Sequence, residues 1–175
     1  MDDAERHVPA ASPGPGGIPA EPSDPELPVR GWAAVGLPVE RMWAIFDDVR
    51  GWPRWNPCFR WARVTGGTLR EGALLCWVFN PIRSRYPYVL PASARIVEYE
   101  PRRGVTWEVT AVPGFSALHR YAFEAVDEDR CRFGSWEVAE GPAYRLLRPF
   151  WLAHFRYVRD ASLAGARALP GRVTR

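Results

Sequence analysis

Residues 142–169 read PAYRLLRPFWLAHFRYVRDASLAGARAL, and this stretch decides the fold. Its large apolar residues recur at steps of three and four, which is the spacing of one face of an α-helix. They are Tyr144, Leu147, Trp151, Phe155 and Val158, with Leu146, Phe150 and His154 widening the same stripe. Because the arginines lie largely off the stripe, the pattern predicts one C-terminal helix with an apolar and a solvated face. At about 1.5 Å per residue the helix would be roughly 42 Å long, and it needs an equally long surface to lie on.

Two features divide this predicted helix. Pro149 cannot donate a backbone hydrogen bond to Arg145, so we expect a bend near residues 145–149. Beyond Val158 the apolar face continues in small residues, which are Ala161, Ser162, Gly165 and Ala166. The aromatic half is therefore expected to fill space or wall a cavity, and the small half to approach its partner closely.

The chain before residue 142 supplies the surface under the helix. Residues 29–36 predict a first strand, and Pro38 is well placed to start a helix because a proline in the first turn loses no needed hydrogen bond. A second short helix is expected before Trp55-Asn56-Pro57. The periodicity then changes to two and predicts six strands, at residues 58–64, 72–79, 88–99, 104–111, 115–126 and 130–139. The order is one strand, two short helices, six strands and one long helix.

The length and the charge distribution bound the organisation of the chain. A chain of 175 residues is long enough for one domain with a sizeable core. Residues 1–28 are rich in Pro, Gly and acidic residues and are predicted to be a disordered tail; residues 29–169 are the domain and residues 170–175 a short C-terminal tail. The first 28 residues carry a charge of −5, so the rest of a chain with net charge +3 carries +8. Its arginines are scattered among acids without a binding motif, so we expect no nucleic-acid partner.

The residue types exclude several kinds of chemistry. The chain has no Lys, which excludes a lysine Schiff base. Three cysteines without CxxC spacing and three distant histidines predict neither a disulfide framework nor a metal site. No phosphate loop, nucleophile elbow or dinucleotide fingerprint is present, so any chemistry is expected to need no cofactor. The acidic N-terminus and a longest apolar run of only residues 73–79 predict a cytoplasmic protein with no membrane span.

Four motifs in order along the chain resemble the polyketide cyclase/dehydrase branch of the START and Bet v 1-like superfamily. They are the 47–57 segment ending in Trp55-Asn56-Pro57, Glu100-Pro101 followed by Val105-x-Trp107, His119-x-x-x-Phe123, and Glu137-x-x-x-Gly141. The resemblance covers residues 29–169. It implies an α+β helix-grip fold, in which a seven-stranded antiparallel sheet wraps round the long C-terminal helix and a hydrophobic ligand cavity lies between them.

Alternation along the strands decides which side chains face that helix. In the sixth strand His119 and Tyr121 share one face, and in the seventh Ser135 and Glu137 do. A three-residue loop at 127–129 would place His119 opposite Glu137 and Tyr121 opposite Ser135. A five-residue loop would instead place Tyr121 opposite Glu137, and the sequence leaves both registers open.

These four polar side chains are thus predicted to meet under the helix among aromatic rings. An apolar setting disfavours the charged form of a carboxylate, and a neighbouring histidine opposes this effect. Such a pair suits general acid–base catalysis on a carbonyl compound, so the candidate catalytic residues are Glu137, His119 and Tyr121. The alternative is that the pair stabilises the sheet or binds a ligand hydroxyl without chemistry. The candidate ligand-binding residues are Trp77, Phe79, Trp107, Phe123, Phe133, Ser135, Trp151, Phe155 and Asn56.

The fold alone does not settle the function, because one scaffold hosts many activities. The first hypothesis is a carrier or binding protein for a hydrophobic, aromatic or polyketide-like molecule. The second is a cofactor-free polyketide cyclase or dehydratase that uses Glu137 and His119. The third is a protein-interaction or chaperone-partner module, which should have no enclosed cavity. A homodimer or an acyl-carrier partner is left open.

Overall fold

The computed structural model describes residues 29–80, 91–110 and 113–173. The tail predicted at residues 1–28 and the start of the strand predicted at 88–99 lie outside the described residues. The strands are β1 (Val29–Val35), β2 (Phe59–Val64), β3 (Leu74–Phe79), β4 (Pro91–Glu100), β5 (Gly104–Val109), β6 (Ser116–Ala125) and β7 (Cys131–Glu140). The helices are α1 (Val39–Asp47), the 3₁₀ turn η1 (Val49–Gly51), α2 (Trp52–Trp55), α3 (Pro142–Leu146), α4 (Arg148–Arg167) and α5 (Pro170–Val173).

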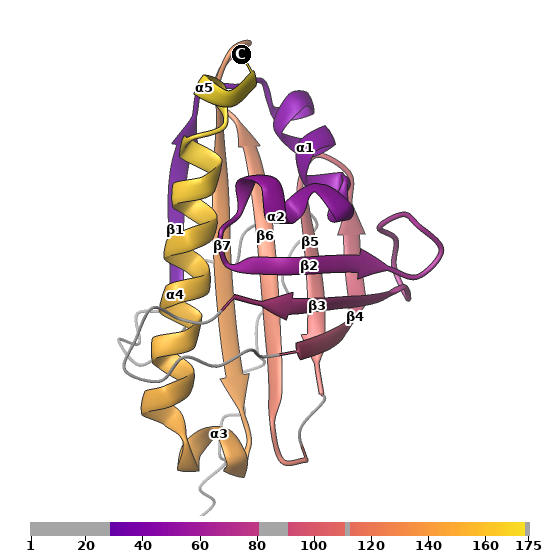
Figure 1. The fold of residues 1–175 in the computed structure, drawn as a ribbon, viewed down its shortest axis with the longest axis vertical. Helices are drawn as coiled ribbons and strands as arrows, with labels where there is room; N and C mark the ends of the chain where they lie inside the picture. The colour runs from indigo at the N-terminus through magenta and orange to yellow at the C-terminus, as the bar shows by residue number, and fades with distance from the viewer. Residues whose placement is uncertain (1–28, 81–90, 111–112, 174–175) are drawn as a thin grey trace, which may run out of the picture.

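The strands form one antiparallel sheet in the order β1-β7-β6-β5-β4-β3-β2. The sheet curls strongly, so that β2 and β3 run nearly across the direction of β6 and β7 (Figure 1). Helix α4 lies along β1 and β7, α1 contacts β6 and β7, and α2 contacts β2 (Figure 1). This arrangement confirms the α+β helix-grip fold, including the two short helices after the first strand.

The long C-terminal helix is confirmed as α4, but the prediction that it runs as a single helix from residue 142 is wrong. The chain forms α3 and then α4, with Leu147 between them at φ −111° and ψ 24°. Pro149 lies in the first turn of α4, where its missing N–H costs no hydrogen bond. The break lies within residues 145–149, where a bend is predicted, but the chain begins a new helix there instead of bending. A further short helix, α5, occupies part of the segment predicted as a C-terminal tail.

The C-terminal half of α4 approaches α2 as closely as its small residues predict. A Cβ added at Gly165 would overlap the backbone carbonyl of Trp55. Beside this contact, the Asn56 side-chain amide donates to Ser162 Oγ at 2.8 Å, and both residues are fully buried. This end of the helix is therefore fixed to the short helices, and the aromatic end projects over the rest of the sheet.

Candidate ligand cavity

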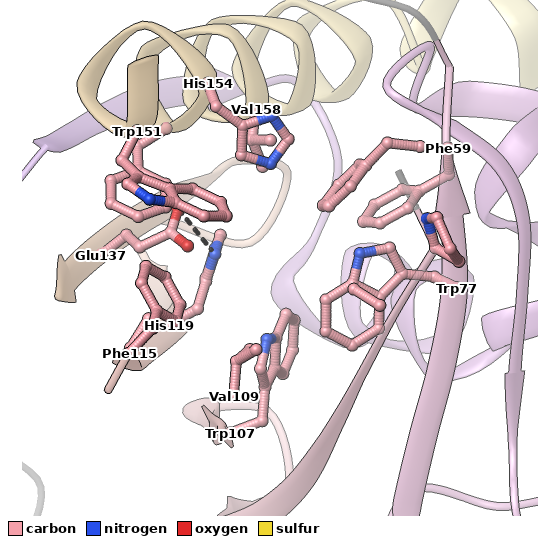
Figure 2. Close-up of a pocket in the computed structure, with 15 residues that line it drawn as sticks. Phe59, Trp77, Trp107, Val109, Phe115, His119, Glu137, Trp151, His154 and Val158 are labelled. Atoms are coloured by element: carbon pink, nitrogen blue, oxygen red, sulfur yellow. Dashed lines mark ion pairs between the residues drawn. The ribbon is translucent and has the colours of Figure 1, made fainter. Parts of the chain in front are cut away.

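A cavity lies between the aromatic half of α4 and the concave face of the sheet (Figure 2). The cavity has a volume of about 70 Å³, counted as the space open to the centres of water molecules. At roughly 10–15 Å³ per water centre, this is room for about five waters or a small organic molecule. The lining residues are Phe59, Trp77, Phe79, Pro91, Ala92, Trp107, Val109, Phe115, Ala117, His119, Glu137, Trp151, His154, Phe155 and Val158.

The pairing of β6 with β7 brings the polar residues of the cavity together. His119 lies opposite Glu137 and Tyr121 lies opposite Ser135, which is the register that the three-residue loop predicts. His119 Nδ1 lies 3.3 Å from Glu137 Oε2, and both side chains are almost fully buried. Figure 2 shows this pair on one wall of the cavity, below Trp151.

Protein groups contact both ring nitrogens of His119. Nδ1 faces Glu137, and Nε2 lies 3.3 Å from Ser135 Oγ. The imidazole ring also stacks on Trp107, with centroids 5.0 Å apart and planes 20° apart. Glu137 Oε1 accepts no hydrogen bond from a described residue. The geometry therefore makes His119 a group that holds Glu137, and Glu137 Oε1 the oxygen that a ligand can meet.

A second histidine, His154, extends from α4 towards the cavity (Figure 2). Its ring meets Phe79 edge to face at 4.7 Å. Burial lowers the pKa of His154 to about 4; the negative charge of Glu137 opposes this shift and His119 adds to it. His154 is therefore neutral at pH 7, so the roof of the cavity carries no positive charge at this point.

In two tryptophans of the cavity, the buried indole nitrogen has no hydrogen-bond partner among the described residues. These are Trp77 Nε1 and Trp151 Nε1. A buried donor left unpaired costs about 1–3 kcal/mol, so such atoms are uncommon in folded proteins. Both nitrogens belong to side chains that line the cavity.

The structure separates the predicted site residues into two groups. Glu137, His119, Trp77, Phe79, Trp107, Trp151 and Phe155 line the cavity. Tyr121, Phe123, Phe133, Ser135 and Asn56 do not line it. For these five residues, direct contact with a ligand stays a prediction.

Aromatic packing and a buried hydrogen bond hold members of the second group, the residues outside the cavity, in the core. Phe123 and Phe133 pack around Phe46 of α1, at centroid distances of 5.0 and 6.3 Å. Tyr121 donates to or accepts from Ser162 Oγ at 2.7 Å. Burial raises the pKa of the Tyr121 phenol well above its ordinary value, so this hydroxyl stays protonated. Short helices α1 and α2 thus fill the part of the concave face that these residues share.

The sequence of this domain matches a known family over nearly its whole length. The match covers residues 29–173, and the family is described as polyketide cyclase / dehydrase and lipid transport. The chain belongs to this family.

Solved structures share the fold of this family member at low sequence identity. A START superfamily protein from Mycobacterium smegmatis has a TM-score of 0.59 and 13% identity, covering 81% of this chain and 98% of that one. The Zhui aromatase/cyclase from Streptomyces sp. R1128 has a TM-score of 0.62 and 14% identity, with coverages of 85% and 96%. The di-domain aromatase/cyclase BexL, from the BE-7585A biosynthetic pathway, has a TM-score of 0.62 and 15% identity; 85% of this chain aligns with 48% of BexL, about half its length. No curated protein sequence matches the chain.

Several lining residues of this family member are not among the predicted site residues. Phe59 is one of them. Strict alternation would put Phe59 and Trp61 on the same face of β2, but a β-bulge between them shifts the register. Trp61 is instead 41% exposed. His154 and Val158 belong to the apolar stripe of the helix, and that stripe is the signal that marks them. The others are Pro91, Ala92, Val109, Phe115 and Ala117.

Within the described ranges, no three His, Cys, Asp or Glu side chains gather so that they could hold a metal ion. The described helices also include none with the length and hydropathy needed to cross a membrane.

Proposed function

We propose that this family member binds a flat, apolar small molecule between its sheet and helix α4. The observation that carries the proposal is the cavity itself, whose walls are aromatic rings from β2, β3, β5 and α4 with few polar atoms among them. Binding sites for small molecules have this composition, with a small number of polar groups that fix orientation. The hypothesis of a protein-interaction module expects no enclosed cavity, so the presence of this cavity does not support it.

A second candidate function is cofactor-free proton transfer, and the His119–Glu137 pair favours it. A carboxylate on an otherwise aromatic wall, with one oxygen held by His119 and the other facing the ligand, suits a general base. Glu137 would remove a proton from a carbon next to a carbonyl group. The electron pair left behind would attack a second carbonyl of the same molecule to close a ring. The proton would then pass from Glu137 to the new alkoxide, so that the carboxylate is regenerated.

One experiment tests both functions. The purified protein is incubated with a panel of aromatic and poly-β-ketone compounds, with tryptophan fluorescence reporting binding and mass spectrometry reporting conversion. Binding with a change of mass that Glu137→Gln abolishes would support the enzyme. The matched control is Glu140→Gln, an exposed carboxylate at the end of the same strand, which should leave conversion unchanged.

Two other outcomes separate the remaining hypotheses. Binding without a change of mass across the panel would support a carrier or binding protein. No binding of any compound would overturn the cavity proposal, on which both functions rest.

If conversion requires a substrate attached to an acyl-carrier protein, the same panel presented as carrier-bound thioesters will react where the free compounds do not. Light scattering of the same samples tests the homodimer.

A further inference from the structure

The indole nitrogen of Trp77 is an unsatisfied donor on the wall of the cavity. Trp77 is 4% exposed, and its Nε1 has no hydrogen-bond partner in the part of the chain that the structure describes. Its ring packs against Phe79 and Trp107, whose aromatic carbons offer no hydrogen-bond acceptor. On the neighbouring strands it pairs with Ala62 and Ala92, which have no polar side-chain atoms either. Figure 2 shows the nitrogen on the side of the ring that faces the cavity.

The polar groups of the cavity lie on different walls. Trp77 is on β3, and Glu137 is on β7, with β4, β5 and β6 between these strands in the sheet. Figure 2 shows Trp77 and the His119–Glu137 pair on opposite sides of the cavity. One wall therefore presents a hydrogen-bond donor and the opposite wall presents a carboxylate oxygen.

We propose that the ligand carries a carbonyl or phenolic oxygen that accepts a hydrogen bond from Trp77 Nε1, on the wall opposite Glu137. This inference rests on the proposed function and narrows its ligand class. It selects oxygenated aromatic molecules over aromatic hydrocarbons and alkyl chains, because only an acceptor atom satisfies the buried donor. It also sets the orientation, with the oxygen towards β3 and the opposite edge of the ligand towards β7.

The test compares two probes that differ in one atom group. In 2-acetylnaphthalene a carbonyl oxygen occupies the position that a methylene group occupies in 2-isopropenylnaphthalene, and the two are otherwise alike in shape. Equilibrium dialysis gives the ratio of their Kd values. In the wild-type protein the ketone should bind about tenfold more tightly, which is the usual value of one hydrogen bond to a buried donor. In Trp77→Phe the ratio should fall to about one.

Trp55→Phe is the matched control. Trp55 Nε1 is also buried and has no hydrogen-bond partner within the described ranges, but Trp55 lies outside the cavity, so its variant should keep the wild-type ratio. A second measurement needs no variant: in wild-type protein labelled with ¹⁵N-tryptophan, the ketone and not the alkene should shift an indole N–H resonance downfield.

The outcomes distinguish this inference from the function it rests on. Equal binding of both probes to the wild-type protein, or a tenfold preference that survives in Trp77→Phe, would overturn the inference and leave the proposed cavity function standing. Failure of both probes and of the whole aromatic panel would overturn the two together. If Trp77→Phe does not fold, Trp151→Phe identifies the donor, because Trp151 Nε1 is the other unpartnered indole nitrogen of the cavity among the described residues. The preference for the ketone and the downfield indole resonance should both survive in Trp151→Phe, and their loss there would overturn the inference.

Discussion

At the residue scale, Ser162 is the point where three elements are joined. Its Oγ accepts from the Asn56 amide at 2.8 Å and lies 2.7 Å from Tyr121 Oη, so that α4, the segment after α2, and β6 meet in one buried polar contact. A buried polar group left without a partner lowers stability. Loss of the Ser162 hydroxyl, which contacts both Asn56 and Tyr121, should therefore cost more free energy than loss of the Tyr121 hydroxyl alone.

Ser162→Ala should therefore destabilise the protein more than Tyr121→Phe. The serine variant leaves the Asn56 amide and the Tyr121 hydroxyl without their partner, which should lower the free energy of unfolding by about 2–4 kcal/mol. The tyrosine variant removes one hydroxyl and leaves the Asn56 contact intact, at about 1 kcal/mol. Urea denaturation at pH 7.5 measures both. Equal losses in the two variants would show that Ser162 does not link the other two residues energetically.

His154 predicts a dependence of stability on pH. Its pKa is about 4 in the folded protein, mainly because of burial, against about 6.5 in the unfolded chain. As the pH falls below 6.5 the unfolded chain binds a proton that the folded protein does not bind, so acid favours unfolding. This contribution is fully present above pH 6.5 and is lost as the pH falls towards 4, and it amounts to about 3 kcal/mol.

His154→Leu should flatten this dependence. The free energy of unfolding, measured in urea at pH 7.5, 6.0 and 5.0, should fall less steeply for the variant than for the wild-type protein. The variant keeps every other titratable side chain, so the difference between the two profiles reports the loss of His154. Parallel profiles would mean that His154 takes up its proton in the folded state as readily as in the unfolded chain.

Alternation predicted the face of each site residue but not its depth along the cavity. His119 and Tyr121 do share the inward face of β6, as expected. Alternation assigns both to the same space, yet His119 lines the cavity and Tyr121 is buried against Phe46 and Ser162. The difference depends on where α1 and α2 fold back over the sheet. That placement is a tertiary contact, and no local pattern in β6 encodes it.

At the element scale, the C-terminal half of α4 depends on the absence of a side chain at Gly165. Alanine is normally favoured over glycine inside a helix by about 1 kcal/mol. Here a Cβ would overlap the carbonyl of Trp55, which belongs to the backbone and cannot rotate away. Gly165→Ala should therefore lower the free energy of unfolding by about 2–4 kcal/mol, through overpacking and displacement of α2.

Gly171→Ala is the control for this change. Gly171 lies in α5, and a Cβ there would meet nothing within 4 Å, so the same substitution should be neutral or slightly stabilising. Thermal unfolding of the two variants side by side measures the contrast. A Gly165→Ala protein as stable as the wild type would show that α4 and α2 separate at little cost.

The helix break illustrates what periodicity detects and what it does not. The apolar spacing continues from Tyr144 to Phe155 without interruption, so it predicts a single helix. Pro149 marks where a continuous helix would lose a hydrogen bond, and it located the break. Whether the backbone bends or starts a new helix depends on Leu147, whose non-helical ψ the hydrophobic pattern does not determine.

At the scale of the whole molecule, α4 has two halves with different partners. Its C-terminal half is fixed to α2 by the Gly165 contact and by the bond between Asn56 and Ser162. Its N-terminal half contributes Trp151, His154 and Phe155 to the roof of the cavity. The cavity interrupts the packing of the N-terminal half. Local opening of this half is therefore expected to cost less free energy than opening of the C-terminal half.

Ligand binding should therefore protect the two halves of α4 unequally from amide hydrogen exchange. A molecule under the roof must leave before residues 148–158 open, so at a concentration of 100 times Kd their exchange should slow by about 100-fold. Residues 159–167 open without exposing the ligand and should slow by less than a few fold. Exchange with and without 2-acetylnaphthalene, followed by mass spectrometry of peptic fragments, makes the comparison. Equal protection of both halves would mean that α4 opens as one unit with the sheet, and no protection of the roof would place the ligand elsewhere.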